Sequence, residues 1–387
     1  MPSTPAQPLD TNARSLSLVG WLIVAWLGML VLGFLSLRIP GALAAANPVS
    51  VARAVFTSAN VNTLTGFPQT FAAPDEFRTS VQMVFLMQLL SGALLTLIGG
   101  GVLLARVLGL PHSDSRIATT GLLMIIGAGL VGLATSAPGE SLISGFSRGV
   151  GALCGSAMTF GRLRGPDDPV LNIALAPLSL MGGFGTLVPL MLYERLVRRS
   201  MLNAHALKVM TVVAGIYLLG MAAIYALGAW RGSEMTLSRG SALIMSAIGY
   251  GYSNELISEL PRGTDWILMA VMLVGFGTAG TGAWGIAWLW TLPQTLLPRA
   301  LIACAVQAAM LLAAVIVLSQ TEPQLAAERI LMLCVGSVTN VGLAHTPVAI
   351  TGPGLQILAA LEVAARLLPL VVMMQMLRHK ALEPHKP

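Results

Sequence analysis

Long runs without a single charged residue recur along this sequence. The residues between Arg14 and Arg38 form the first such run. Further runs cover residues 79–105, 117–139, 169–193, 209–230, 266–298 and 300–321, and the stretch 330–361 is also uncharged but is interrupted by Gly, Pro, Asn and His. A helix of about 20 apolar residues crosses a hydrocarbon core of about 30 Å. With a last span at about Leu355–Leu377, the pattern predicts a polytopic all-α membrane protein with about eight transmembrane helices.

Charge decides which side of the membrane the ends face. Only 10% of the residues are charged, against about 25% in soluble domains. With eight spans both termini lie on one side, and the basic cluster Arg195, Arg198, Arg199 and Lys208 in one short loop favours the cytoplasm for that side.

The net charge of +6 is spread over many loops, so no nucleic-acid partner is expected. The first run exceeds the 7–15 residues of a cleavable signal core, so a retained helix is predicted.

The long connections on the other side contain four similar stretches. They read "VFTSANVNTLTGF" (55–67), "FSRGVGALCGSAM" (146–158), "SALIMSAIGYGY" (241–252) and "LMLCVGSVTNVGL" (331–343). Gly66, Ala157, Gly251 and Gly342 are then equivalent, at spacings of 91, 94 and 91 residues. An internal repeat is indicated. We expect a cytoplasmic tail (1–15), repeat 1 (16–109), repeat 2 (110–200), repeat 3 (201–298) and repeat 4 with a tail (299–387).

Each stretch is too apolar for a solvated loop and too short to span. Non-helical backbone at membrane depth survives only where protein buries it or water reaches it. Four helix–pore-loop–helix repeats around a pseudo-fourfold axis satisfy that condition, because rings of backbone carbonyls can replace the hydration shell of a monovalent cation. Interfacial helices that end in ordinary glycine turns are the alternative interpretation of any single stretch.

At these residues the sequence resembles the Trk/Ktr/HKT superfamily of potassium transporters, over roughly residues 16–377. "TLTGF" is similar to its Thr-x-x-Gly-Phe filter segments, and "GSVTNVGL" resembles its fourth loop. "ALCGSAM" and the following "DPVLNIALAPLSLMGGFGTLV" resemble its second repeat. "GFGTAGTGAWGIA" (275–287) stands where the superfamily has a Gly/Ser-rich gate, and "LEVAARLLPLV" is similar to its arginine-bearing last helix.

The resemblance implies translocation of potassium, or of sodium, through a carbonyl-lined selectivity filter. The ion-binding filter positions are Leu64, Thr65, Gly66, Gly155, Ser156, Ala157, Tyr250, Gly251, Val341 and Gly342. The gate positions are Gly277, Gly280, Gly282, Trp284 and Arg366. Two alternatives stay open here: the gate glycines serve helix packing, or Arg366 pairs with Glu362 on one helix face. Outer acids such as Asp75, Glu76, Glu255 and Glu259 concentrate cations at the mouth or are solvated loop charges.

Three positions depart from the superfamily pattern. Ala157 stands where the second filter should have glycine, Trp284 replaces a small residue in the gate, and Ala287 replaces its lysine. A bulky indole would narrow the passage. These departures favour a second hypothesis, in which the chain is a non-conducting homologue that acts as a scaffold or regulatory membrane subunit.

No enzymatic chemistry is indicated. The histidines form no metal-protease or triad pattern, and no phosphate-binding loop is present. The three scattered cysteines form neither a disulfide framework nor a metal-ligand spacing. We therefore expect no cofactor and no metal beyond K⁺ or Na⁺ as the transported ion. The resemblance implies a homodimer, a cytosolic nucleotide-binding regulatory subunit, and location in the inner membrane of a bacterium.

Overall fold

The computed structural model describes most of the chain. The described residues are 8–43, 49–69, 76–156, 168–199, 203–233, 235–249, 256–275, 289, 292–350 and 352–382. They form helices, with two isolated β-bridges as the extended pairings among them. The expected all-α fold is confirmed.

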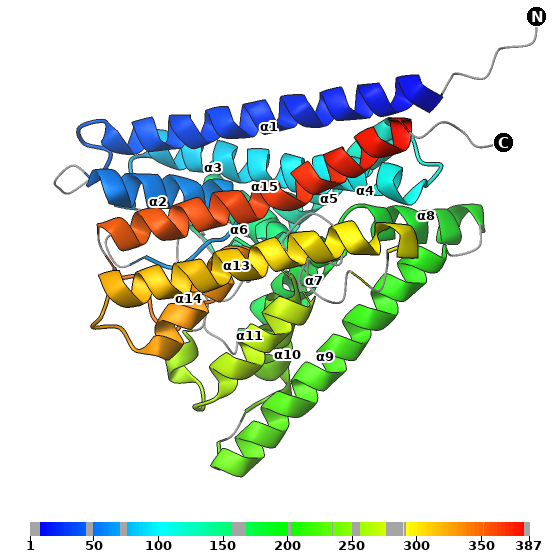
Figure 1. The fold of residues 1–387 in the computed structure, drawn as a ribbon. Coiled ribbons are helices and arrows are strands. Elements are labelled where there is room, and N and C mark those ends of the chain that lie inside the picture. The colour runs from blue at the N-terminus through cyan, green and yellow to red at the C-terminus, as the bar shows by residue number, and fades with distance from the viewer. Residues whose placement is uncertain are drawn as a thin grey trace, which may run out of the picture.

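The same order of elements recurs four times along the chain. A long helix comes first: α1 (Pro8–Arg38), α5 (Asp114–Ala134), α9 (Ala204–Arg231) and α13 (Leu297–Thr321, preceded by η5, Gln294–Leu296). A short helix follows: α2 (Val51–Asn62), α6 (Leu142–Cys154), α10 (Leu237–Gly249) and α14 (Ala327–Thr339). After a loop comes a further helical segment, which takes a different form in each quarter (Figure 1).

These further segments differ in continuity. The first is one span built of α3 (Thr79–Ala93), the π-helix η2 (Leu94–Gly100) and α4 (Gly101–Leu108). The second comprises η3 (Leu171–Leu175), α7 (Ala176–Gly183) and α8 (Leu187–Arg198). The third is α11 (Thr264–Gly275), which follows the short 3₁₀ turn η4 (Ile257–Glu259), and the fourth is α15 (Pro353–Leu382).

Within the described residues, six helices are long and apolar enough to cross a membrane. The segments Asn172–Gly183 and Leu187–Arg198 meet at 102°, and they make a seventh if the pair is one broken span. The glycines at 182, 183 and 185 and the proline at 189 explain the break, since they are poor helix formers. Thr264–Gly275 is apolar but short, and residues 276–288 of the expected span 266–298 lie outside the described residues. The chain is a multi-pass membrane protein.

Two of the short helices, α2 and α6, begin where the sequence supplies a capping serine. Ser50 accepts a hydrogen bond from the Arg53 amide at the start of α2, and Ser141 accepts one from the Ser144 amide at the start of α6. Such caps satisfy amides that have no partner inside the helix. From these starts, α2 and α6 run for 12 and 13 residues through buried surroundings.

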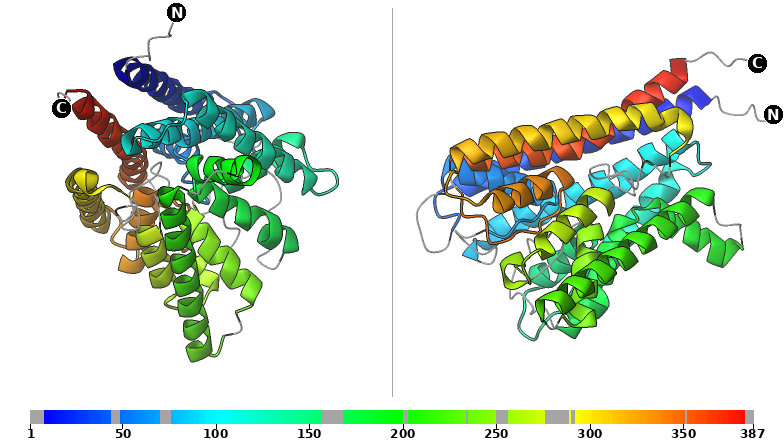
Figure 2. Two further views of the ribbon diagram at one scale, coloured as in Figure 1. Left: turned by 90° about the vertical axis from the view of Figure 1, so that its right-hand side faces the viewer. Right: turned by 60° about the horizontal axis from the view of Figure 1, so that its bottom comes forward.

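Packing arranges the short helices in a closed ring. Each one contacts the segment that ends the preceding quarter of the chain: α6 packs on α3, α10 on α7, α14 on α11, and α2 on α15. The last contact joins the two ends of the chain. Accordingly, the start of α1 and the end of α15 lie at one end of the molecule (Figures 1 and 2). The ring supports the four predicted repeats, while the boundaries at residues 15, 109, 200 and 298 stay predictions.

Candidate functional site: the loops at the ends of the short helices

The loop after α2 is completely buried. Thr63, Leu64, Thr65 and Phe67 are all 0% exposed. Leu64 and Gly66 have φ angles of 63° and 73°. This left-handed conformation costs a leucine energy but is easy for glycine. A branched side chain in this conformation, at a buried turn, marks strain that the surroundings must hold in place.

Asn60 holds this loop from within α2. Its side-chain amide donates to the Phe67 carbonyl at 3.0 Å, and its side-chain oxygen accepts from the Phe67 amide at 2.8 Å. The Gly66 amide also donates to the Asn60 main-chain oxygen at 3.2 Å. The turn from Asn60 to Phe67 is therefore closed by one residue.

We expect Asn60→Asp to destabilise the protein by about 2 kcal/mol or more, because the aspartate cannot donate and faces the Phe67 carbonyl in a buried site. The drop in melting temperature in detergent measures the effect. Thr120→Ala is the matched control, since the exposed Thr120 hydroxyl bonds only within its own helix. Equal melting temperatures for the two variants would contradict the role given to Asn60.

The loop after α14 lies directly against the loop after α2. Asn340 ends α14 with a φ of 52°, and the Val341 amide donates to the Gly336 carbonyl at 2.8 Å. A Cβ atom on Gly342 would stand 2.7 Å from the carbonyl carbon of Gly66 and would also clash with the Thr65 oxygen. Only glycine allows the two backbones to come this close.

Three loops share one register at the point where their short helix ends. Leu64, Gly155 and Asn340 are the left-handed residues after α2, α6 and α14. Gly66, Ala157 and Gly342 each follow two positions later in the sequence. Gly155 is thus the counterpart of Leu64 and Asn340, and Ala157 is the counterpart of the two filter glycines. In the sequence the second loop has alanine at the position that corresponds to the two filter glycines.

The ends of α6 and α10 meet on α7. A Cβ atom on Gly182 would clash with the Leu153 carbonyl oxygen, and one on Gly249 would clash with Ser179. Gly183 faces Gly249, with a built Cβ 3.2 Å from its Cα. Ser156, beyond Gly155, is 0% exposed. The C-terminal ends of these two short helices therefore lie beside one another across α7.

Arg366 lies between the end of α2 and the rest of the ring. Its side chain is 1% exposed. The guanidinium donates to the Thr63 carbonyl and, at 3.4 Å, to the Thr96 hydroxyl of η2. It is also close enough to Cys154, the last residue of α6, to interact with it electrostatically. The guanidinium is thus directed at the end of α2 and at η2, and its role as a gate stays a prediction.

Several predicted site residues lie outside the described residues. These are Ala157, Tyr250 and Gly251 of the filter, Gly277, Gly280, Gly282 and Trp284 of the gate, and the outer acids Asp75 and Glu255. Of the other outer acids, Glu76 and Glu259 are exposed, as solvated loop charges would be. The described filter positions Thr65 and Gly66 contact Gly342 or its neighbour Asn340. Leu64 lies against Gly92 of α3, and Gly155 and Ser156 lie at the end of α6.

Sequence reasoning missed the residues that hold the loops together. Asn340 donates to the Thr65 hydroxyl and to the Glu362 carbonyl, both at 3.1 Å. Asn62 exchanges two hydrogen bonds with the Trp26 side chain and carbonyl. The available signal was the presence of asparagines inside short apolar helices, where unbonded amides are costly.

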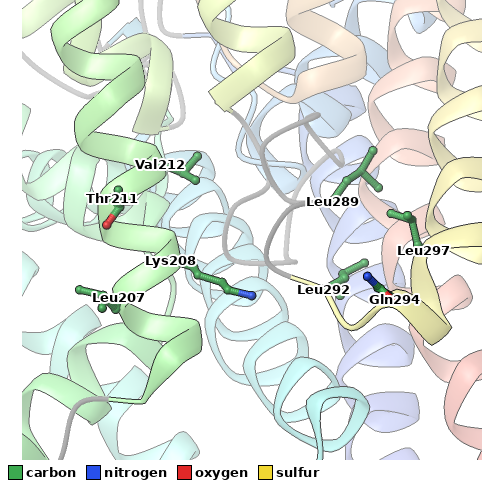
Figure 3. A pocket seen from close by; sticks show the side chains of 8 residues that line it. All are labelled: Leu207, Lys208, Thr211, Val212, Leu289, Leu292, Gln294 and Leu297. Carbon is green, nitrogen blue, oxygen red and sulfur yellow. The ribbon is translucent and has the colours of Figure 1, made fainter.

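A separate cavity of about 660 Å³ lies between α9 and the start of α13. Lys208 and Gln294 face each other across it, among leucines and a valine (Figure 3). Its lining residues Leu289 and Leu292 follow the predicted gate stretch in the sequence. None of its lining residues belongs to the four loops.

No protein-family model matches this sequence, and no curated protein sequence matches it. The fold, in contrast, is that of a known class of membrane protein, the Trk-type potassium transporters. The chain resembles the crystal structure of the potassium transporter TrkH from Vibrio parahaemolyticus with a TM-score of 0.70. The likeness covers 96% of this chain and 86% of that one at 14% identity. The fold that the loop motifs suggested is confirmed.

Proposed function

We propose that this chain translocates a monovalent cation, potassium or sodium, across the cytoplasmic membrane. The observation that carries the proposal is the convergence of short-helix C-termini on buried loops. The C-terminal end of a helix bears a partial negative charge, which favours a cation. Here the ends of α2 and α14 abut through Gly66 and Gly342, and the end of α6 lies beside Arg366. The TrkH-like fold supports this function.

The loop residues supply the chemistry that this function needs. The filter positions Thr65, Gly66, Val341 and Gly342 would present carbonyl oxygens in place of water around the ion. Selection between potassium and sodium depends on how these oxygens are spaced. No covalent step and no cofactor enters the proposal. Arg366, directly beside the Thr63 carbonyl, would raise the energy of a cation leaving the loops.

A flux measurement tests the function. The purified chain in liposomes should release a potassium or sodium gradient, and its expression should restore growth of a bacterium that lacks potassium uptake at low external potassium. Empty liposomes and liposomes with the Gly342→Ala variant are the controls. If the protein is inserted and folded but moves neither ion above the empty-liposome rate, the proposal is wrong.

A non-conducting scaffold or regulatory subunit is the second candidate. It is favoured by the full burial of the first loop and by the contact of Arg366 with the Thr63 carbonyl. The bulky Trp284 at a predicted gate position points the same way. In that case the wild-type protein should carry no flux, and Trp284→Gly should open a pathway. Robust flux through the unmodified protein would exclude this candidate.

The same proposal extends to partners and location. A homodimer and a cytosolic nucleotide-binding subunit are proposed from the superfamily resemblance. The basic residues Arg195, Arg198 and Lys208 offer a contact surface at the ends of α8 and α9. The inner membrane of a bacterium, with both termini in the cytoplasm, is the proposed location.

A further inference from the structure

Glu362 is an acidic side chain in the middle of α15 and is 0% exposed. Neither of its carboxylate oxygens has a hydrogen-bond partner in the part of the chain that the structure describes. Arg366, one turn further along α15, directs its guanidinium to Thr63 and Thr96 instead. A buried carboxylate without a compensating group is very costly. A bound proton or a bound cation must therefore neutralise the negative charge of this carboxylate.

The neighbouring hydrogen-bond donors are already in use. Glu362 faces the Thr63 hydroxyl, but that hydroxyl donates to the Ala59 carbonyl at 2.7 Å. The Thr65 hydroxyl, 2.8 Å from the Thr63 hydroxyl, must therefore be the donor between the two threonines. Asn340 gives its amide protons to Thr65 and to main-chain carbonyls. No proton of this network remains for the carboxylate.

The orientation of Asn340 leaves a third side-chain oxygen without a partner among the described residues. Its nitrogen faces the carbonyls of Ser337 and Glu362, and only a donor can face two carbonyls. Its side-chain oxygen is consequently fixed on the other side, where it is buried and has no hydrogen-bond partner among the described residues. Oxygen atoms without donors are the ligands that a hard cation takes.

Helix dipoles reinforce the need for positive charge. Thr63 caps the C-terminal end of α2, and Asn340 caps that of α14. The Glu362 carboxylate faces the first cap and the Glu362 main-chain carbonyl faces the second, so the residue lies beside two negatively polarised helix ends. An anion is disfavoured at such a place, whereas a cation is favoured.

We propose that the Glu362 carboxylate, beside Thr63 at the end of α2, is a binding site for one dehydrated monovalent cation, and that the cation displaces a proton from Glu362. In the exchange the cation binds the carboxylate, the O–H bond breaks, and the proton leaves to bulk water. The inference rests on the proposed cation translocation and names a site for that ion behind the first and fourth loops.

The charged and titratable groups on the surrounding helices are engaged elsewhere or lie at the helix ends. Arg53 of α2 donates to the carbonyls of Val348 and Ile350. Arg106 of α4 pairs with Asp114 at 2.6 Å. The remaining charged groups are Glu322 and Arg299 at the two ends of α13, Glu328 and Arg329 at the start of α14, Asp10, Arg14 and Arg38 toward the ends of α1, and Arg378 near the end of α15. The thiols are Cys304 of α13, Cys334 of α14 and Cys154 of α6. Arg366, on α15 itself, is the cation nearest along the helix.

Infrared difference spectroscopy at constant pH tests the exchange directly. Replacing choline by potassium or sodium should remove the carbonyl band of a protonated carboxylic acid from the wild-type protein and add a carboxylate band. The change should be absent in Glu362→Gln and present in the control Glu328→Gln, whose side chain is exposed on α14. Cation affinity in Glu362→Gln should fall roughly 10- to 100-fold, the effect of losing one charge-assisted interaction.

Two results would overturn the proposal. One is a Glu362-dependent acid band that neither cation alters, which means a permanently protonated side chain. The other is the absence of any Glu362-dependent band. The flux assay keeps the two proposals apart. A wild-type protein without flux whose band responds to cations would refute translocation alone, and normal flux with an unresponsive band would refute the Glu362 site alone.

Discussion

Gly342→Ala should abolish cation flux while most of the fold survives. The added methyl group would meet the Thr65 oxygen and the carbonyl carbon and oxygen of Gly66, the latter two at 2.7 and 2.8 Å. These are backbone atoms of a loop fixed by Asn60, so they cannot turn aside as a side chain would. The two loops must separate, at a cost of about 1–3 kcal/mol for overpacking. The flux of potassium or sodium in liposomes measures the loss.

Gly127→Ala is the matched control for this variant. Gly127 lies in α5, and a built Cβ there meets nothing within 4 Å, so flux and melting temperature should stay at or above wild-type values. If Gly342→Ala carries wild-type flux, the apposition of the first and fourth loops is not part of the pathway.

Arg366→Gln should increase flux through the protein. At an assumed separation of about 8 Å and an effective dielectric constant of about 20, a unit charge opposes a cation by about 2 kcal/mol, which is roughly 30-fold in rate. Glutamine removes the charge and keeps one amide donor for the Thr63 carbonyl. Steady-state flux in liposomes, with reconstituted protein quantified in each sample, is the measurement.

Arg366→Lys separates the charge from the shape of the side chain. The lysine variant keeps the positive charge and should therefore keep the low wild-type flux, while it loses the two-point contact with Thr63 and Thr96. If both variants lose flux equally, Arg366 positions the first loop and is no electrostatic barrier.

The sequence predicts the spanning helices well because each one depends on a continuous run of uncharged, apolar residues. The charge-free runs 79–105 and 209–230 correspond to the spans Thr79–Leu108 and Ala204–Arg231. The 102° bend between α7 and α8 was not predicted. The absence of charge shows that a run can enter a membrane, but it does not show whether the run stays straight. The equivalence of Ala157 with Gly66 and Gly342 stays a prediction from spacing, since Ala157 lies outside the described residues.

The contacts that build the candidate site could not be predicted from the sequence. Asn340 and Thr65 are 275 residues apart, and no periodicity links them. The Arg366 side chain was expected either at the gate or paired with Glu362, and only tertiary packing decides between these. The burial of Glu362 among donors that are already used likewise depends on the packing of two helix ends, those of α2 and α14, against the middle of α15.

The closed ring sets the order in which the protein can be completed during synthesis. The first loop leaves the ribosome early, yet its partners Asn340, Gly342 and Arg366 belong to the last quarter of the chain. Until these arrive, the polar groups of Thr63 and Thr65 and the strained Leu64 lack their final partners. A chain truncated before α14 consequently holds a first loop whose buried polar groups lack these hydrogen-bond partners. The packing of α14 and α15 against the first loop is thus the last step of assembly, and the site forms only when the whole chain has been made.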